Sequence, residues 1–133
     1  QEYFVPLRHF VAFARGMAKV LREHKVEALN VSIRHSPADV DALLPWAKEE
    51  VFSFVLYHKQ RTHARAQKAV GVWTRVLIDL VLQCEGRYYL PYQLHATQQQ
   101  FDKAYPEARA LRELKQSVDP RGVFSNELWA KYL

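Results

Sequence analysis

The sequence predicts an α+β fold: a ferredoxin-like antiparallel sheet with two helices on one face, followed by a C-terminal helical tail. Short strand-like runs and two long helical patterns occur in the order strand, helix, strand, strand, helix, strand. Two strand–helix–strand halves of this kind form one sheet with both helices on the same face. After residue 92 the pattern becomes helical. We therefore expect one unit over residues 1–92 and a tail over residues 93–133.

The chain opens with a strand and a helix. Alternation over residues 2–6 predicts a short strand, and Pro6 marks the turn into the helix. The helix is predicted because apolar residues recur every three or four positions and form one stripe: Phe10, Phe13, Ala14, Met17, Val20 and Leu21. This stripe is expected to pack on the sheet.

Two further strands follow, joined by a long polar connection over residues 37–50. Leu29, Val31 and Ile33 alternate with polar residues, so we expect a half-buried strand with one apolar face. Residues 51–58 are almost continuously apolar or aromatic, which predicts a central strand covered on both faces. The two strands are expected to form a wide hairpin.

The second helix is predicted over residues 62–84. Its buried stripe is expected to contain Ala69, Trp73, Val76, Leu77, Leu80 and Val81. Gly86 is expected to end it as a left-handed C-cap. A fourth strand is predicted over residues 88–90, closed by Pro91.

The tail is predicted to contain three helices. Two patterns cover residues 97–104 and 107–117. Residues 119–122 form a turn with Pro and Gly in favoured places. Ser125 or Asn126 can cap a final short helix.

Composition narrows the class of protein. Hydrophobic residues make up 49% of the 133 positions and charged residues 25%, which is the balance of a folded domain. No apolar run reaches the ~20 residues that a transmembrane helix needs. The single Cys84 excludes an internal disulfide and fits a reducing compartment, so a cytoplasmic location is expected, or a membrane-associated one for the full-length protein. The sequence opens with Gln1 inside a strand pattern, and we expect a fragment made by proteolysis or by truncation.

Two classes of site are not expected from the motifs. The sequence has no glycine-rich phosphate loop, and no His-Glu-x-x-His or Cys-x-x-Cys spacing that would predict a metal site. The formal charge of +5 indicates an anionic neighbour, which is a nucleic acid, a phosphate group or an acidic partner domain. Charge alone does not choose among these.

The end of the chain carries the most specific pattern. It contains Tyr105-Pro106, then Leu114-Lys115, then the run Asp-Pro-Arg-Gly-Val-Phe-Ser-Asn over residues 119–126. This combination resembles the C-terminus of FAD-linked oxidases of the vanillyl-alcohol oxidase superfamily. The nearest pattern is the branch with aldonolactone oxidases, alditol oxidases and decaprenylphosphoryl-ribose oxidase. The preceding β-α-β-β-α-β unit is similar, more loosely, to that family's cap domain.

The resemblance implies a function for the longer protein. Residues 1–92 would be the cap, or substrate, domain, and the tail would pack on an N-terminal FAD-binding domain that this sequence lacks. The cofactor would be FAD, bound mainly by that absent domain. The full-length enzyme would oxidise an alcohol-type substrate, such as a sugar, polyol or lactone-like molecule, by hydride transfer to the flavin. The fragment alone is expected to be inactive.

The resemblance also implies substrate and catalytic residues. In the alditol oxidase branch, an acidic residue and an Arg two positions apart bind substrate hydroxyls; the matching positions here hold Ser32 and Arg34, so the acid is absent. The family's Lys near the flavin is replaced by Tyr92, which donates a hydrogen bond but supplies no positive charge. Tyr57 and His58 end their strand on opposite faces, and one of them should face the pocket. We assign Tyr57 to substrate binding and His58, with Tyr92, to catalysis.

Cofactor contacts are expected from four further residues, which are Tyr89, Gln93, His95 and Asn126. Each site residue also has a structural alternative: a solvated Arg on a strand, a structural His at a strand end, or a Tyr pair that packs in the core or at an interface.

Two other functions remain open. A basic ferredoxin-like sheet with aromatic residues is also the plan of an RNA-recognition domain, and a protein-interaction module is the third possibility. Residues 51–58 lack the Lys/Arg-Gly-Phe pattern of RNA recognition, so no nucleic-acid partner is expected. Five basic residues crowd the start of the second helix, where they oppose the helix dipole: Lys59, Arg61, His63, Arg65 and Lys68. An anion nearby would relieve this conflict; otherwise the face is solvated.

Overall fold

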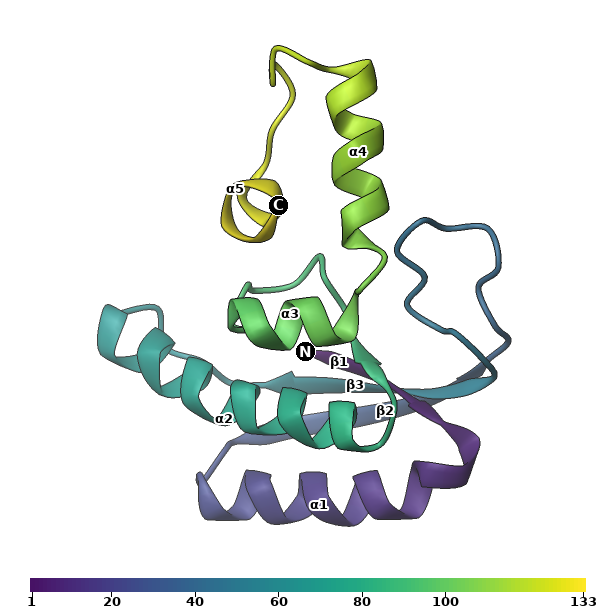
Figure 1. Cartoon of the computed structure of the whole chain (residues 1–133). Coiled ribbons are helices and arrows are strands. Elements are labelled where there is room, and N and C mark those ends of the chain that lie inside the picture. Colours follow the sequence, from purple (N-terminus) through teal and green to yellow (C-terminus); the bar gives the residue numbers. More distant parts are fainter.

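A computed structural model describes residues 1–133 and contains a four-stranded antiparallel sheet in the order β2-β3-β1-β4. The strands are β1 (Glu2–Pro6), β2 (Ala28–Ser36), β3 (Val51–His58) and β4 (Arg87–Tyr88). The helices that connect them are η1 (Leu7–His9), α1 (Phe10–Glu23) and α2 (Ala64–Gln83). Figure 1 shows α1 and α2 on one side of the sheet. The strand order and the two interleaved β-α-β units confirm the predicted fold class.

The main core lies between the sheet and these two helices. Alternate residues of the central strands point at the helices, and Tyr3, Val5 and Phe54 are at most 1% exposed. The ring of Phe13 from α1 lies 5.0 Å from the ring of Phe54, centroid to centroid. On α2, Leu77 is fully buried in the same cluster. The 3.6-residue period of the helices and the two-residue period of the strands therefore meet in one apolar layer.

The edge strand β2 is more exposed than predicted. Leu29 is 72% exposed and Ile33 is 47% exposed, although both were expected on a covered apolar face. The register shifts between Ala28 and Asn30, which leaves Leu29 in a β-bulge. The strand itself is confirmed, but α1 and α2 cover it only in part because it lies at the edge of the sheet.

The buried stripe of α2 is wider than predicted and is rotated about the helix axis. Val76 is 40% exposed and Ala69 is exposed, whereas Val70, Thr74 and Ile78 are buried. The difference arises because α2 packs against both the sheet and the tail helix α3 (Gln98–Ala104). The predicted stripe considered only the contact with the sheet and therefore left out the residues that pack on α3.

The end of α2 corrects the prediction that Gly86 is a left-handed cap. Glu85 has the left-handed conformation, with φ 57°, and the Gly86 N–H donates to the Val81 carbonyl at 2.8 Å. Gly86 is required for a different reason. A Cβ at this position would lie 2.2 Å from the carbonyl oxygen of Phe4.

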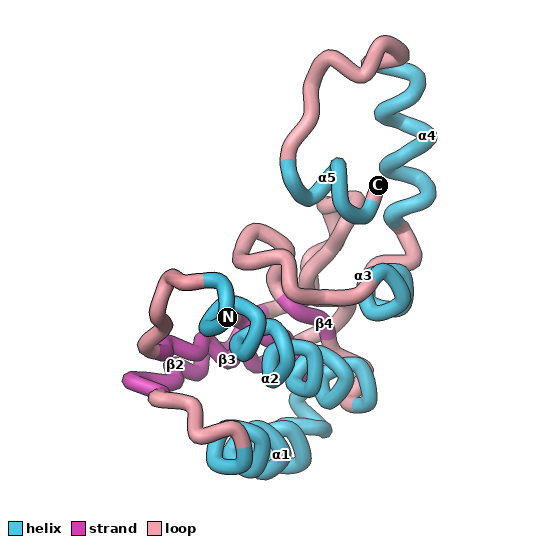
Figure 2. The backbone as a smooth tube through the Cα atoms, turned by 90° about the vertical axis from the view of Figure 1, so that its left-hand side faces the viewer, coloured by secondary structure: helices cyan, strands magenta, loops and turns pink.

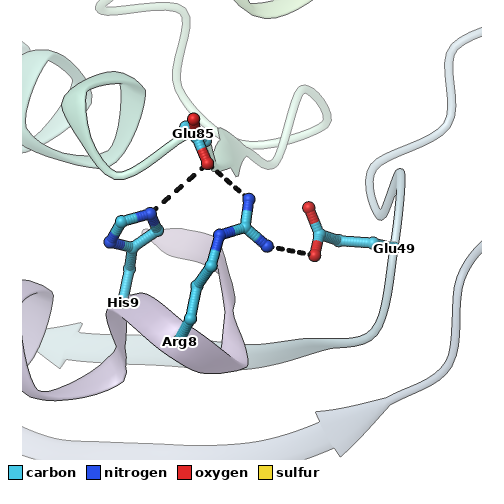
Figure 3. Close-up of polar contacts among 4 residues, drawn as sticks. All are labelled: Arg8, His9, Glu49 and Glu85. Atoms are coloured by element: carbon cyan, nitrogen blue, oxygen red, sulfur yellow. Dashed lines mark hydrogen bonds and ion pairs between the residues drawn. The ribbon is translucent and has the colours of Figure 1, made fainter.

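A polar cluster surrounds the side chain of Glu85 (Figure 3). The Arg8 guanidinium donates to both Glu85 and Glu49, and His9 Nε2 lies 3.3 Å from Glu85. The hydrogen bond from Arg8, then that from His9, holds the pKa of Glu85 below its usual value. All four side chains are substantially exposed, so the cluster orients the 37–50 connection more than it stabilises the fold.

The tail contains α3, α4 (Ala108–Val118) and α5 (Glu127–Tyr132), which confirms the three predicted helices. Thr97 and Gln100 form a capping box at the start of α3. Figures 1 and 2 show α4 and α5 on the side of the sheet away from α1. The aromatic residues Phe101 and Tyr105 belong to the same core cluster as the sheet, so the tail is anchored to it.

Arg87 makes the polar part of this anchor. Its side chain is 2% exposed and donates to both carboxylate oxygens of Glu107, at 2.7 and 2.8 Å. It also donates to the Pro45 carbonyl and lies 4.7 Å from the centroid of the Tyr105 ring. One buried cation thus joins β4, the 37–50 connection and the tail.

We expect Glu107→Gln to lower the free energy of unfolding by about 1–3 kcal/mol, because a buried guanidinium loses its counter-charge. Glu113→Gln is the matched control on the same helix, since the Arg109–Glu113 pair is exposed, and it should cost less than about 0.5 kcal/mol. Urea denaturation measures both. Equal losses for the two variants would contradict the role of Arg87.

The close approach at Gly86 gives a second prediction. Gly86→Ala should lower the free energy of unfolding by about 3 kcal/mol or more, because the Cβ meets a backbone oxygen that has no room to move. Gly122→Ala is the control, since Gly122 has φ 63° but nothing within 4 Å of a Cβ, and it should cost about 1 kcal/mol. Thermal melts of the two variants compare them directly.

Candidate functional site

The candidate site is the face of the sheet opposite α1 and α2, called here the uncovered face. Strand alternation and register place Glu2 and Phe4 of β1, Ser32 and Arg34 of β2, and Ser53, Val55 and Tyr57 of β3 on it. At one end, Trp46 of the 37–50 connection packs on Phe4, with ring centroids 4.6 Å apart. Tyr89 packs edge-on against the same ring, with centroids 5.9 Å apart. The face is thus bordered by loops and the tail and is not covered by a helix layer.

Two pockets open on this face. One, of about 370 Å³, is lined by Glu2, Arg34, Ser53, Trp46 and Tyr89, among others. The other, of about 480 Å³, lies toward the end of β3 and is lined by Val55, Tyr57, Tyr92 and Gln93, among others. Both are of the size that small-molecule sites have.

The structure brings most of the predicted substrate and cofactor residues to this face. Arg34 forms no ion pair and no hydrogen bond, and Tyr57 is 59% exposed. Tyr92 lies 5.1 Å from Tyr89 between ring centroids. Ser32 accepts a hydrogen bond from the Asn30 amide at 3.3 Å. Five side chains predicted from scattered segments therefore lie together: Ser32, Arg34, Tyr57, Tyr89 and Tyr92.

Tyr92 lines the pocket at the end of β3 together with Tyr57 and packs on Tyr89. Burial raises the pKa of the Tyr92 phenol, Glu2, Tyr57 and Tyr89 raise it further, and Arg34 opposes the shift. Tyr92 therefore keeps its proton at neutral pH and acts as a hydrogen-bond donor. The assignment of Tyr92 to catalysis stays a prediction.

Glu2 also lines the candidate site, and sequence reasoning missed it. The Ser53 hydroxyl donates to Glu2 Oε1, and Ser53 is 4% exposed. A Glu alternating with Phe4 and Pro6 on the same strand was the available signal, since a carboxylate next to two buried apolar side chains needs a reason to be there. The strand was predicted, but its polar side was not considered.

Three predicted site residues lie elsewhere. His58 is on the helix side of the sheet, 4.9 Å from the Trp73 ring in an edge-on arrangement, although it also borders the Tyr57 pocket. His95 packs near α2 and its backbone oxygen accepts from Arg75 at 3.3 Å, while its ring contacts Gln93. Asn126 caps α5 by accepting from the Trp129 N–H at 2.8 Å. Their assigned roles in catalysis and cofactor binding stay predictions.

The basic residues at the start of α2 are all exposed. Lys59 and Arg61 border a third pocket, of about 470 Å³, between this helix start and the end of α1. His63 is the N-cap of α2 and accepts from the Ala66 N–H. No acidic residue lies in the first turn of α2, so the conflict with the helix dipole is present in the structure.

The tail motif has a structural explanation. The Asp119 carboxylate accepts the N–H groups of Val123 and Phe124, each at 3.0 Å, and pairs with Lys115. The bond from Lys115 and then these N–H groups lower the pKa of Asp119 to about 2. Gly122 takes the left-handed conformation that the turn needs. The motif therefore builds a rigid turn that projects Phe124, which is 78% exposed.

The position of His58 predicts a pH dependence of stability. Burial holds the pKa of His58 below its ordinary value of 6.5, so the unfolded chain takes up the proton first as the pH falls. The free energy of unfolding should therefore decrease from about pH 6.5 downwards. His58→Phe keeps the aromatic contact and cannot be protonated, so it should lose less stability between about pH 7.5 and 5. Parallel pH profiles for the two proteins, from urea midpoints, would contradict this.

One comparison with known proteins gives a match. A family model described as D-arabinono-1,4-lactone oxidase matches residues 1–132. Neither the comparison with curated proteins nor that with solved structures gave a match. No helix is both long enough and apolar enough to cross a membrane. The family match covers nearly the whole chain and confirms the resemblance to the C-terminal part of FAD-linked oxidases, so this chain belongs to the D-arabinono-1,4-lactone oxidase family.

Proposed function

We propose that this chain is the substrate side of an FAD-dependent oxidoreductase that oxidises a sugar, polyol or lactone-like alcohol by hydride transfer to flavin. The observation that carries the proposal is the uncovered face, where Arg34, Tyr57 and Tyr92 surround two pockets. Membership of a family named for a lactone oxidase supports a reaction in which an alcohol carbon of the substrate is oxidised.

The residues of the uncovered face suit both a substrate and a flat cofactor ring. Aromatic side chains and neutral hydroxyls border the pockets, and Tyr89 and Gln93, which line them, would be the residues to contact a cofactor ring. When bound, FAD would supply the hydride acceptor. The chain's own groups would orient the substrate. Arg34 would donate a hydrogen bond to a substrate oxygen, and Tyr92 would donate one from its phenol. Ser32 and Tyr57 would donate hydrogen bonds to substrate hydroxyls or accept them.

The partner in this proposal is the FAD-binding domain of the same protein. Apolar side chains at the end of α4 and in the turn after it are exposed: Leu114 46%, Val118 71%, Val123 63% and Phe124 78%. An apolar patch held on a rigid turn suits a protein contact. The chain by itself is expected to be inactive, because the hydride acceptor belongs to the partner domain.

The test uses the full-length protein and measures flavin reduction as the loss of the flavin absorbance. Anaerobic addition of D-arabinono-1,4-lactone, or of a sugar alcohol such as sorbitol, should reduce the flavin. Arg34→Ala should lower kcat/KM by about 10–100-fold, because a charge-assisted hydrogen bond to substrate is lost. Arg22→Ala is the control, since Arg22 is exposed on α1, on the helix side of the sheet, and lines neither pocket, so this variant should leave kcat/KM unchanged.

Two outcomes would contradict the proposal. One is a full-length protein that binds no flavin. The other is a flavoprotein whose flavin is reduced equally well by wild type and Arg34→Ala, since the uncovered face would then play no part in binding the substrate.

A further inference from the structure

Two opposite charges face the same pocket on the uncovered face without meeting. Glu2 and Arg34 both line the pocket of about 370 Å³, and no ion pair joins them. The geometry of the sheet keeps them apart. Arg34 lies directly across from Ser53 on β2, whereas Glu2 lies on β1, diagonal to Ser53.

Ser53 fixes the carboxylate on its side of the pocket. It is the buried residue between the two charged strands, and its hydroxyl donates to Glu2 Oε1. Glu2 Oε2 has no hydrogen-bond partner in the protein. This oxygen is not buried, so it is open to the pocket and free to accept a hydrogen bond from a ligand there.

The pocket therefore offers an acceptor on one wall and a donor on the other. An ionised carboxylate only accepts hydrogen bonds, and a guanidinium only donates them. A hydroxyl group does both, so a chain or ring with neighbouring hydroxyls satisfies both walls. A substrate carboxylate satisfies Arg34 but brings a second negative charge next to Glu2, which like-charge repulsion disfavours.

We propose that Glu2 is a specificity-determining residue, which with Arg34 selects a neutral polyhydroxylated substrate over the corresponding sugar acid. The inference rests on the proposed function, because it concerns the substrate of that same face. It assigns the acceptor role to β1, since Ser32 on β2 has no charge to fill it.

The experiment compares two substrates with the same carbon skeleton, D-arabinono-1,4-lactone and its hydrolysis product D-arabinonate. The first is neutral and the second is an anion. Anaerobic flavin reduction in the full-length protein gives the ratio of kcat/KM for lactone to kcat/KM for aldonate. Wild type should favour the lactone, and Glu2→Gln should lower this ratio about tenfold, because the repulsion is removed and one charge-assisted acceptor is lost.

Three variants separate specificity from structure. Glu2→Asp keeps the charge and should keep the ratio. Its shorter side chain leaves a wider gap to the substrate, which lowers both rates. Glu23→Gln removes an exposed carboxylate from α1 and should change neither rate nor ratio. Ser53→Ala frees Glu2 and should lower the lactone rate with a smaller effect on the ratio. Circular dichroism spectra that match wild type establish that each variant is folded.

The outcomes distinguish the inference from the proposed function. Flavin reduction by lactone with an unchanged ratio in Glu2→Gln, or equal losses for both substrates, overturns the role of Glu2 and leaves the proposed function standing. A flavoprotein that no lactone, aldonate or sugar alcohol reduces overturns the proposed function, and the inference with it.

Discussion

The buried guanidinium of Arg87 sets the borders of the uncovered face. Its side chain is almost completely enclosed and binds a carbonyl of the 37–50 connection and the carboxylate of Glu107 at the start of α4. A buried charge that loses its partner is strongly unfavourable. Two segments far apart in the sequence are therefore held at the same edge of the sheet by one residue of β4. The loop border, with Trp46, and the tail border both follow from this contact.

The division of the sheet into two unlike faces follows from simple periodicity. Alternate side chains of β1 and β3 enter the helix-covered core, and the residues between them face away. Apolar residues dominate the first set. The second set mixes polar Glu2, Ser53 and Tyr57 with buried Phe4 and Val55, and β2 adds Arg34 to the same face. Polar groups of this kind are costly to bury without partners. A sheet built in this way has one face covered by helices and one face with polar side chains next to two pockets.

Much of this arrangement could be predicted from the sequence. The strands and helices were predicted because their apolar periods are regular. Ser32 and Arg34 were proposed as site residues from the family resemblance, and strand alternation only assigned them a shared face. The misses have physical causes. The exposure of Leu29 follows from a bulge that no local pattern encodes. Glu85 rather than Gly86 is left-handed because the helix ends with a hydrogen bond from the Gly86 N–H to the Val81 carbonyl, and the glycine is needed for the close approach of Phe4. Contacts between distant segments decide both.

The site was harder to predict than the fold. The pairing of Glu2 with Ser53 depends on the register between β1 and β3, and the separation of His58 from Tyr57 depends on which face the helices cover. Sequence reasoning placed Tyr57 and His58 on opposite faces but had no means of choosing between them. The structure places Tyr57 with Arg34 and Tyr92.

The most direct test of the account is a crystal structure of the full-length protein with its flavin and a bound sugar alcohol. The account predicts that the isoalloxazine ring lies over the uncovered face, beside Tyr92, with substrate hydroxyls between Glu2 and Arg34. A structure in which another part of the protein fills both pockets, with the flavin elsewhere, would contradict it.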